Sequence, residues 1–265
     1  MSLLSQPKKR NSWQIMVDTV KALLLREVKT RFGGSRMGYF WALFDPIAQM
    51  AFLGAIFTLI GRESITGVPI AIFLVVAIMP YKLFSKLLPQ LSAAVSANKA
   101  LFGYRQVAPI DPVITRLLIE IVTFVVVYFL VLVIMGWLGI DSVPDDFLKL
   151  VLVIFALISM SLGLGLLLCS AALYWQDTPK LLNIALMPMF FISGIFFWAT
   201  MIPSQYWFLF DWNPVFHITE LSRDAFFESY NTPIGDLGYV ATVALGCLAA
   251  GLITFHINRV RFITL

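Results

Sequence analysis

The chain has 265 residues, of which 60% are hydrophobic and 13% are charged, and its formal net charge is +4. Together with a mean hydropathy of +0.87, this composition excludes a soluble globular domain, because such domains are close to half apolar and a quarter charged. An integral membrane protein is expected. The two cysteines, Cys169 and Cys247, lie inside apolar runs and suit neither a disulfide framework nor a metal site.

Residues 1–39 form a basic N-terminal region that precedes the first long apolar run. It has no short apolar segment followed by a small-residue cleavage site, so no signal peptide is expected. Within it, residues 12–32 place apolar side chains at helical spacing and most charges on other faces; the apolar set is Trp13, Met16, Val17, Val20, Leu24 and Val28. We expect a cytoplasmic amphipathic helix that lies along the inner leaflet.

Six apolar runs of membrane-spanning length follow. A hydrocarbon core about 30 Å thick needs roughly 20 helical residues. Runs that meet this length are 40–60, 68–88, 113–137, 147–174, 181–201 and 236–257. The sequence therefore predicts an all-α integral membrane protein, with a six-span transmembrane domain over 40–257 and a short C-terminal tail, residues 258–265.

The distribution of basic residues gives the orientation. An even number of spans puts both termini on one side, and with the termini inside, sixteen Lys and Arg residues fall on the cytoplasmic side. Only Arg62, Lys149 and Arg223 fall outside. The positive-inside rule then predicts a multi-pass membrane protein whose termini, and with them the C-terminal tail, are cytoplasmic.

Two connections between the spans are more than simple loops. The cytoplasmic segment 89–112 ends in Asp111 and Pro112, a good N-cap and first residue for the third span, and leaves room for one short helix at about Ser92–Phe102. The outer segment 202–235 is too polar for a span and too aromatic for a plain loop. Asn213 and Pro214 begin a helix there, and we expect two short re-entrant helices covered by protein.

Several kinds of chemical site lack support in the sequence. No G-x-x-x-x-G-K-[ST] motif is present, so the chain has no Walker loop for a nucleotide, and no G-x-S-x-G motif suggests a nucleophile. His217 and His256 are far apart, which gives a metal centre little support. Gly163-Leu164-Gly165 indicates close helix packing, as do Ser161, Gly165 and Cys169 at a spacing of four. We expect no catalytic residue, metal or cofactor in this chain.

Ionisable residues inside the spans are few. Arg116 and Glu120 are four residues apart, which favours a buried ion pair over a transport role. Lys82 and Lys86 lie at the inner end of the second span. They either extend to the inner membrane surface or face a polar conduit for an anion, and the sequence leaves both alternatives open.

Three separated stretches resemble permease subunits of capsular polysaccharide ABC exporters, the KpsM-like group. They occur in the family's order: REVKTRFGGSRMGYFWALFDP at the first span, NKALFGYRQVAPIDP after the second span, and QYWFLFDWNPVFHITELSRDAFF in the outer region. Together they cover most of the sequence outside the spans.

The resemblance implies a half-transporter. Two copies would pair as a homodimer, each would dock one copy of a separate ATPase subunit that binds ATP and Mg, and the complex would export a lipid-linked acidic polysaccharide across the inner membrane. Further partners implied are a periplasmic co-polymerase and an outer-membrane polysaccharide export protein. Nucleic acid is not an expected partner.

Because the chain lacks a nucleotide site, we place its contact with the ATPase in the 89–112 segment. In this hypothesis Leu101, Phe102 and Tyr104 are apolar anchors and Arg105 meets an acidic rim, with Asn98 and Lys99 in the same surface. The alternative is a loop that only carries positive-inside charge.

A second hypothesis concerns the path of an acidic polymer. Its cationic entrance would be Lys29, Arg31 and Arg36, with sugar rings stacking on Phe40, Trp41 and Phe44, and Lys82 and Lys86 further along. The alternatives are that the charges contact anionic lipid and that the aromatic side chains are belt or core residues.

A third hypothesis makes the outer region a gate near the exit. Its residues would be Tyr206, Trp207, His217, Glu220 and Arg223. Glu220 and Arg223 are three apart on a helix, so a plain intrahelical pair is the alternative.

Other functions remain as alternatives. Within exporters, permeases for O-antigen or teichoic acid are the nearest alternatives. A membrane-bound enzyme that modifies glycans or lipids would need clustered acidic or His residues, whereas those of the inner face, Asp18, Glu27, Asp111 and Asp177, are dispersed. A secondary transporter would be expected to show internal repeats, and the halves show no convincing one.

Overall fold

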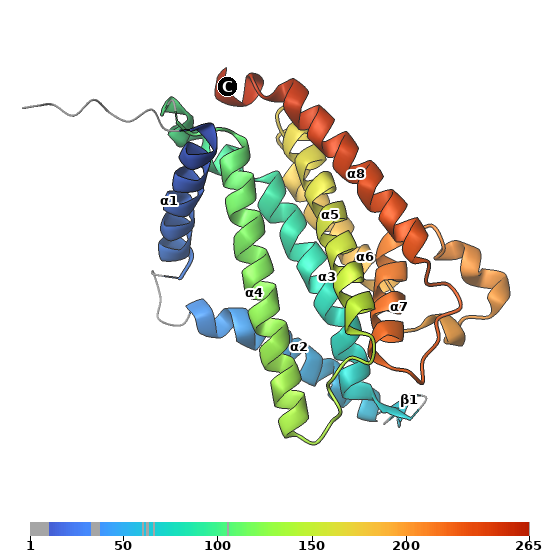
Figure 1. Cartoon of the computed structure of the whole chain (residues 1–265). Helices are drawn as coiled ribbons and strands as arrows, with labels where there is room; N and C mark the ends of the chain where they lie inside the picture. The colour runs from blue at the N-terminus through green and yellow to red at the C-terminus, as the bar shows by residue number, and fades with distance from the viewer. Residues whose placement is uncertain are drawn as a thin grey trace, which may run out of the picture.

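The computed structural model describes residues 11–32, 38–59, 61, 64–65, 67–104 and 106–264, and these are mostly helical (Figure 1). In chain order the elements are α1 (Ser12–Phe32), α2 (Gly38–Leu59), β1 (Ser64–Ile65), β2 (Val68–Pro69), α3 (Ile70–Ser92), η1 (Ser96–Gly103), α4 (Ile110–Trp137), α5 (Phe147–Ala171), α6 (Thr178–Ile192), η2 (Ala199–Met201), η3 (Ser204–Leu209), α7 (Pro214–Phe226), α8 (Leu237–Asn258) and α9 (Arg261–Thr264). The η elements are 3₁₀ helices, and β1 pairs antiparallel with β2.

Four of the described helices, α3, α4, α5 and α8, are long and apolar enough to cross a membrane. They match four of the six predicted runs. The other two runs correspond to α2, whose apolar part is Ile47–Phe57, and to α6, which has 15 residues. The predicted fifth run, 181–201, was too long, because α6 ends at Ile192 and Gly194 adopts a positive φ of 72°. A Cβ at Gly194 would also lie 2.7 Å from the Phe216 ring, so the chain turns where only glycine fits.

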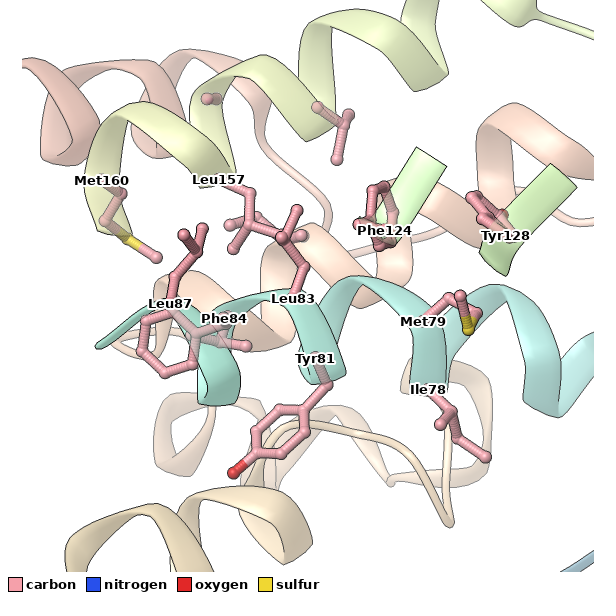
Figure 2. Packing of buried hydrophobic residues seen from close by; sticks show 14 of the residues in the cluster. Ile78, Met79, Tyr81, Leu83, Phe84, Leu87, Phe124, Tyr128, Leu157 and Met160 are labelled. Atoms are coloured by element: carbon pink, nitrogen blue, oxygen red, sulfur yellow. The ribbon is translucent and has the colours of Figure 1, made fainter. Parts of the chain in front are cut away.

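Helix α3 is the centre of the molecule. It packs against α2, α4, α5, α6 and α7, and every side chain from Ile72 to Met79 is at most 2% exposed. Figure 2 shows Leu83 and Leu87 of α3 beside Leu157 and Met160 of α5. A helix that is apolar all round is one that is buried on all sides, as α3 is here.

Helices α5 and α8 pack closely enough for their backbones to touch. A Cβ at Gly163 would overlap the backbone of Cys247, and one at Gly251 would overlap the backbone of Gly163. Gly165 faces α3 instead, since its Cβ would lie 2.6 Å from Cβ of Leu91. The predicted close packing is confirmed, and the two glycines serve different neighbours because two residues along a helix turn the chain by more than half a revolution.

The helix predicted at 12–32 is confirmed as α1, which runs alongside α4 (Figure 1). Val20 and Leu23 are its buried apolar side chains, whereas Trp13 is 66% exposed. Its placement along a membrane surface stays a prediction.

The outer region holds two short helices, as predicted, in η3 and α7. Asn213 caps α7 through its side chain, which accepts a hydrogen bond from the Val215 amide at 3.0 Å, and Pro214 is the first helical residue. Helix α7 packs against α3, α5 and α8, and almost all of its side chains are buried. Whether these helices re-enter the membrane stays a prediction.

Candidate functional site

The candidate residues gather in three places along the helices: the η1 end, a charged cluster between α2, α3 and α4, and the interior of the outer region. At the η1 end, the predicted short helix forms as the 3₁₀ helix Ser96–Gly103, shifted toward the C-terminus because α3 continues to Ser92. The third span was predicted to begin at residue 113, which is too far along the chain. Helix α4 begins at Ile110, and Asp111 lies in its first turn, where its carboxylate accepts from the Ala108 amide at 2.8 Å.

The proposed anchors at η1 differ in exposure. Tyr104 is 67% exposed and Lys99 is exposed, Leu101 is half-buried, and Phe102 is only 8% exposed within the hydrophobic core. Phe102 therefore packs into the core and holds η1 against the helices. Arg105 lies outside the described residues.

Asn98 has a structural role that its sequence position did not indicate. Its side chain is buried, its Oδ1 accepts a hydrogen bond from the guanidinium of Arg26 on α1, and its Nδ2 donates to the Ala94 carbonyl at 2.9 Å. Asn98 thus holds α1 against η1.

An ionic contact joins α1 to α4. Arg116 Nε lies 3.0 Å from Glu27 Oε1, and Arg116 Nη1 donates to the Gln90 carbonyl at 2.8 Å. The predicted partner of Arg116 was Glu120, so that pairing is corrected. The packing of α1 on α4 brings Glu27 within reach from 89 positions away, a contact that helical spacing cannot reveal.

A groove of about 500 Å³ lies between α1 and the η1 segment. Its walls include Ile15, Asp18 and Leu23 of α1 on one side and Leu101, Tyr104 and Val107 on the other. Helix α9 also packs against η1. Its Phe262 is buried at 2% exposure, and the ring centroids of Phe262 and Phe255 are 4.7 Å apart. This end of the molecule is therefore a composite surface of three segments.

The structure describes the side chains of only some of the residues proposed for the entrance and the path. Lys29 is exposed and Phe44 is 43% exposed. Arg36 lies outside the described residues. Arg31 lies in α1, and Phe40 and Trp41 lie in α2, but the side chains of these three residues are not among those that the structure describes.

The two lysines of α3 share one carboxylate. Lys82 Nζ lies 2.7 Å from Asp45 Oδ2 of α2, and Lys86 Nζ lies 4.0 Å from the same oxygen. The Lys82 side chain is 13% exposed and that of Lys86 is 44% exposed. A cavity of about 30 Å³ next to them is also lined by Glu120 and Thr123 of α4, and it is large enough for a water molecule. The arrangement is a charge cluster that can bind a polar group.

In the outer region, Glu220 and Arg223 form a salt bridge at 2.8 Å with both side chains fully buried. The other carboxylate oxygen of Glu220 accepts from Tyr230 Oη at 2.5 Å and from Thr232 Oγ1 at 3.1 Å. The intrahelical pair that was the alternative to a gate role is thus present, inside a network to which Tyr230 and Thr232 also belong.

Arg223 extends this network to neighbouring segments. It donates to the carbonyls of Ile195 and Phe197, each at 3.3 Å, and its guanidinium lies 4.4 Å from the centre of the Phe73 ring on α3. Burial lowers the pKa of Arg223 while Glu220 opposes this shift, and burial together with Glu220 raises the pKa of Tyr230. Removing one partner of such a buried ion pair is strongly destabilising, because it leaves the other charge buried and uncompensated.

His217 is buried and connects three segments. Its Nδ1 accepts from the Asp236 amide at 3.2 Å and its Nε2 lies 2.8 Å from the Asp211 carbonyl oxygen, which fits the neutral tautomer protonated at Nε2. Of the five proposed gate residues, His217, Glu220 and Arg223 are interior, Trp207 is half-buried with its Nε1 donating to the Ile202 carbonyl, and Tyr206 is 48% exposed.

No group of three or more His, Cys, Asp or Glu side chains in the described part of the chain could hold a metal ion.

Comparisons with known proteins match the sequence of this chain to one family. A model of the ABC-2 type transporter family matches residues 18–227. The chain is 36% identical to the polysialic acid transport protein KpsM of Escherichia coli, over 96% of this chain and 99% of that protein. It is 27% identical to the capsule polysaccharide export inner-membrane protein CtrC of Neisseria meningitidis, over 88% of each chain. It is 22% identical to the O-antigen export system permease protein RfbA of Klebsiella pneumoniae, over 93% of this chain and 94% of that one.

Proposed function

Because the chain belongs to the ABC-2 type transporter family, we propose that it is the membrane-spanning subunit of an exporter for a lipid-linked acidic capsular polysaccharide. The observation that carries this proposal is the 36% identity to a polysialic acid transport protein over nearly the full length of both chains. ATP hydrolysis in a separate ATPase subunit drives the export. The substrate crosses the bacterial inner membrane toward a periplasmic co-polymerase and an outer-membrane export protein.

Deletion of the gene in its own host tests this function. Surface polysaccharide is expected to disappear while lipid-linked polymer accumulates in the cytoplasm, and a plasmid copy restores export. Loss of O-antigen or teichoic acid from the surface, with capsule intact, would support the alternative exporter instead. That alternative has a specific basis in the similarity to an O-antigen permease.

The proposed arrangement is a homodimer in which each copy crosses the membrane six times, with both termini cytoplasmic. The helices α2 and α6 supply the two spans beyond the four long ones, and both expose apolar side chains, such as Phe52 of α2 and Met187 of α6. Labelling of single cysteines introduced at positions 104 and 145 tests the orientation. Position 104 should react only after the membrane is opened, and position 145 in intact spheroplasts.

We place the ATPase contact on the composite surface of α1, η1 and α9. Tyr104 is its exposed aromatic side chain and Lys99 its exposed cation. Phe102 does not contact the ATPase directly in this proposal, because its side chain is buried in the core. Leu101 borders the groove between α1 and η1, where an apolar side chain of the partner fits.

The variant Tyr104→Asp tests this contact. It puts a carboxylate into an apolar anchor position, so co-purification of the ATPase is expected to fall at least about tenfold. Phe208→Asp is a matched control, because Phe208 is similarly exposed, at 69%, but lies in η3 of the outer region, away from this surface. Normal co-purification of the ATPase with Tyr104→Asp contradicts the assignment.

For the path of the polymer, we propose that Lys82 and Lys86 bind anionic groups in transit. They lie one turn apart on α3 and already hold a carboxylate, that of Asp45. Asp45 is 61% exposed, so it can withdraw and leave both ammonium groups to an anion of the substrate.

A further inference from the structure

A large apolar groove between α4 and α5 has no role in the proposed transport function. Each of these helices packs against α3, and between them the groove has a volume of about 660 Å³. It runs from the middle of both helices to the loop that joins them, at the lower edge of Figure 1. Phe129 and Val133 form the α4 wall, and Val151 and Phe155 form the α5 wall.

The lining is suited to hydrocarbon. Nearly all of its surface is apolar, and the four wall residues named above are between 45% and 66% exposed, so their side chains meet whatever fills the groove. Both helices are long and apolar enough to cross a membrane. The molecules that surround such helices are lipids, and a flexible acyl chain can make dispersion contacts with the apolar side chains of both walls.

The rim of the groove adds a charge preference. Residues 142–144 and Phe147 line the groove, and the exposed carboxylates of Asp141, Asp145 and Asp146 alternate with them along the chain. Lys149, the basic residue of this segment, is bound to Asp224 of α7. The rim is therefore negative at the end of two spanning helices, where lipid headgroups lie, so it attracts an ammonium group and repels an anionic headgroup.

We propose that the α4–α5 groove binds an acyl chain of a zwitterionic phospholipid, with the ammonium headgroup against Asp141 and Asp145. The site holds one lipid of the leaflet at the 138–146 loop. It does not depend on the proposed export function, because it uses none of the residues assigned to the ATPase contact or to the polymer path.

Native mass spectrometry of the purified complex with its ATPase tests the site. The complex is stripped of lipid and then exposed to equal amounts of phosphatidylethanolamine and phosphatidylglycerol with the same chains. One phosphatidylethanolamine per copy is expected to remain, with at least about a fivefold preference over phosphatidylglycerol, the factor that one charge contact at a membrane surface supplies. Equal retention of the two lipids overturns the proposal.

Two sets of variants separate the groove from the rim. Val133→Trp fills the groove and should remove the bound lipid, whereas Leu245→Trp on exposed α8 should not. Asp141→Asn with Asp145→Asn should keep one lipid bound but lose the headgroup preference. If Val133→Trp does not accumulate, Val133→Phe provides a smaller filling group.

The contrary results are equally specific. Lipid retention that is the same in the wild type and the groove-filling variant overturns the site. So does a groove-filling variant that keeps its lipid but loses the second copy of the chain, because the groove would then be covered by protein.

Discussion

Two buried tyrosines differ in what their hydroxyl groups contact. Tyr230 Oη donates to Glu220, whereas Tyr128 Oη has no hydrogen-bond partner among the described residues. We expect Tyr230→Phe to lower the stability by about 1–3 kcal/mol, since it weakens the support of a buried carboxylate. Tyr128→Phe should change it by less than about 0.5 kcal/mol or raise it, because it removes an unsatisfied polar atom. Thermal unfolding of the detergent-purified protein compares the two, and equal losses would contradict this reading of the network.

Glu27 and Arg116 permit a charge-exchange experiment. Reversing either charge alone should release α1 from α4, because it leaves two like charges facing each other across a partly buried contact. The double variant Glu27→Arg with Arg116→Glu should recover part of the lost stability, and Glu120→Gln should not affect that recovery. Limited proteolysis in α1 provides the measurement. A double variant that is cleaved as fast as the single ones would argue against the pair.

At the scale of elements, the contact between α5 and α8 depends on glycine at two facing positions. Gly251→Ala is expected to separate the helices and to cost several kcal/mol, because its Cβ would overlap the backbone of Gly163. Gly246→Ala on the same helix is the matched control, since nothing lies within 4 Å of its Cβ. Protein yield and unfolding temperature distinguish them. Similar behaviour of the two variants would mean that α5 and α8 lie farther apart.

The elements predicted from sequence are those with strong local signals. Long apolar runs gave α3, α4, α5 and α8, helical spacing gave α1, and Asn213-Pro214 gave the start of α7. Local sequence signals could not predict the features that depend on tertiary contacts. The partner of Arg116 comes from a distant helix, and the burial of Glu220 and Arg223 depends on segments that converge only in the fold. Tyr230 and Thr232 carried no pattern that could mark them as parts of that network.

At the scale of the whole molecule, the anion-binding role proposed for the lysine pair on α3 can be tested by measuring export. Lys82→Gln with Lys86→Gln should reduce surface polysaccharide by at least about tenfold, because the loss of even one charge-assisted hydrogen bond, worth about 1.5–3 kcal/mol, corresponds to a factor of ten or more. Asp45→Asn removes the same salt bridge but leaves both cations, so it should retain export. Capsule quantification at matched protein levels makes the comparison. If both variants lose export equally, the contact with α2 matters and binding of anions does not.

The buried network around Arg223 also determines how the outer region can move. Its bonds join α7 to the segment after α6 and to α3, which is itself enclosed by the rest of the bundle. Cooperative opening of a protein follows such units, and the unit that holds the most buried contacts opens last. Helix α7 therefore belongs to the slowest-opening part of the fold. We therefore expect α7 and α3 to move together as one rigid body.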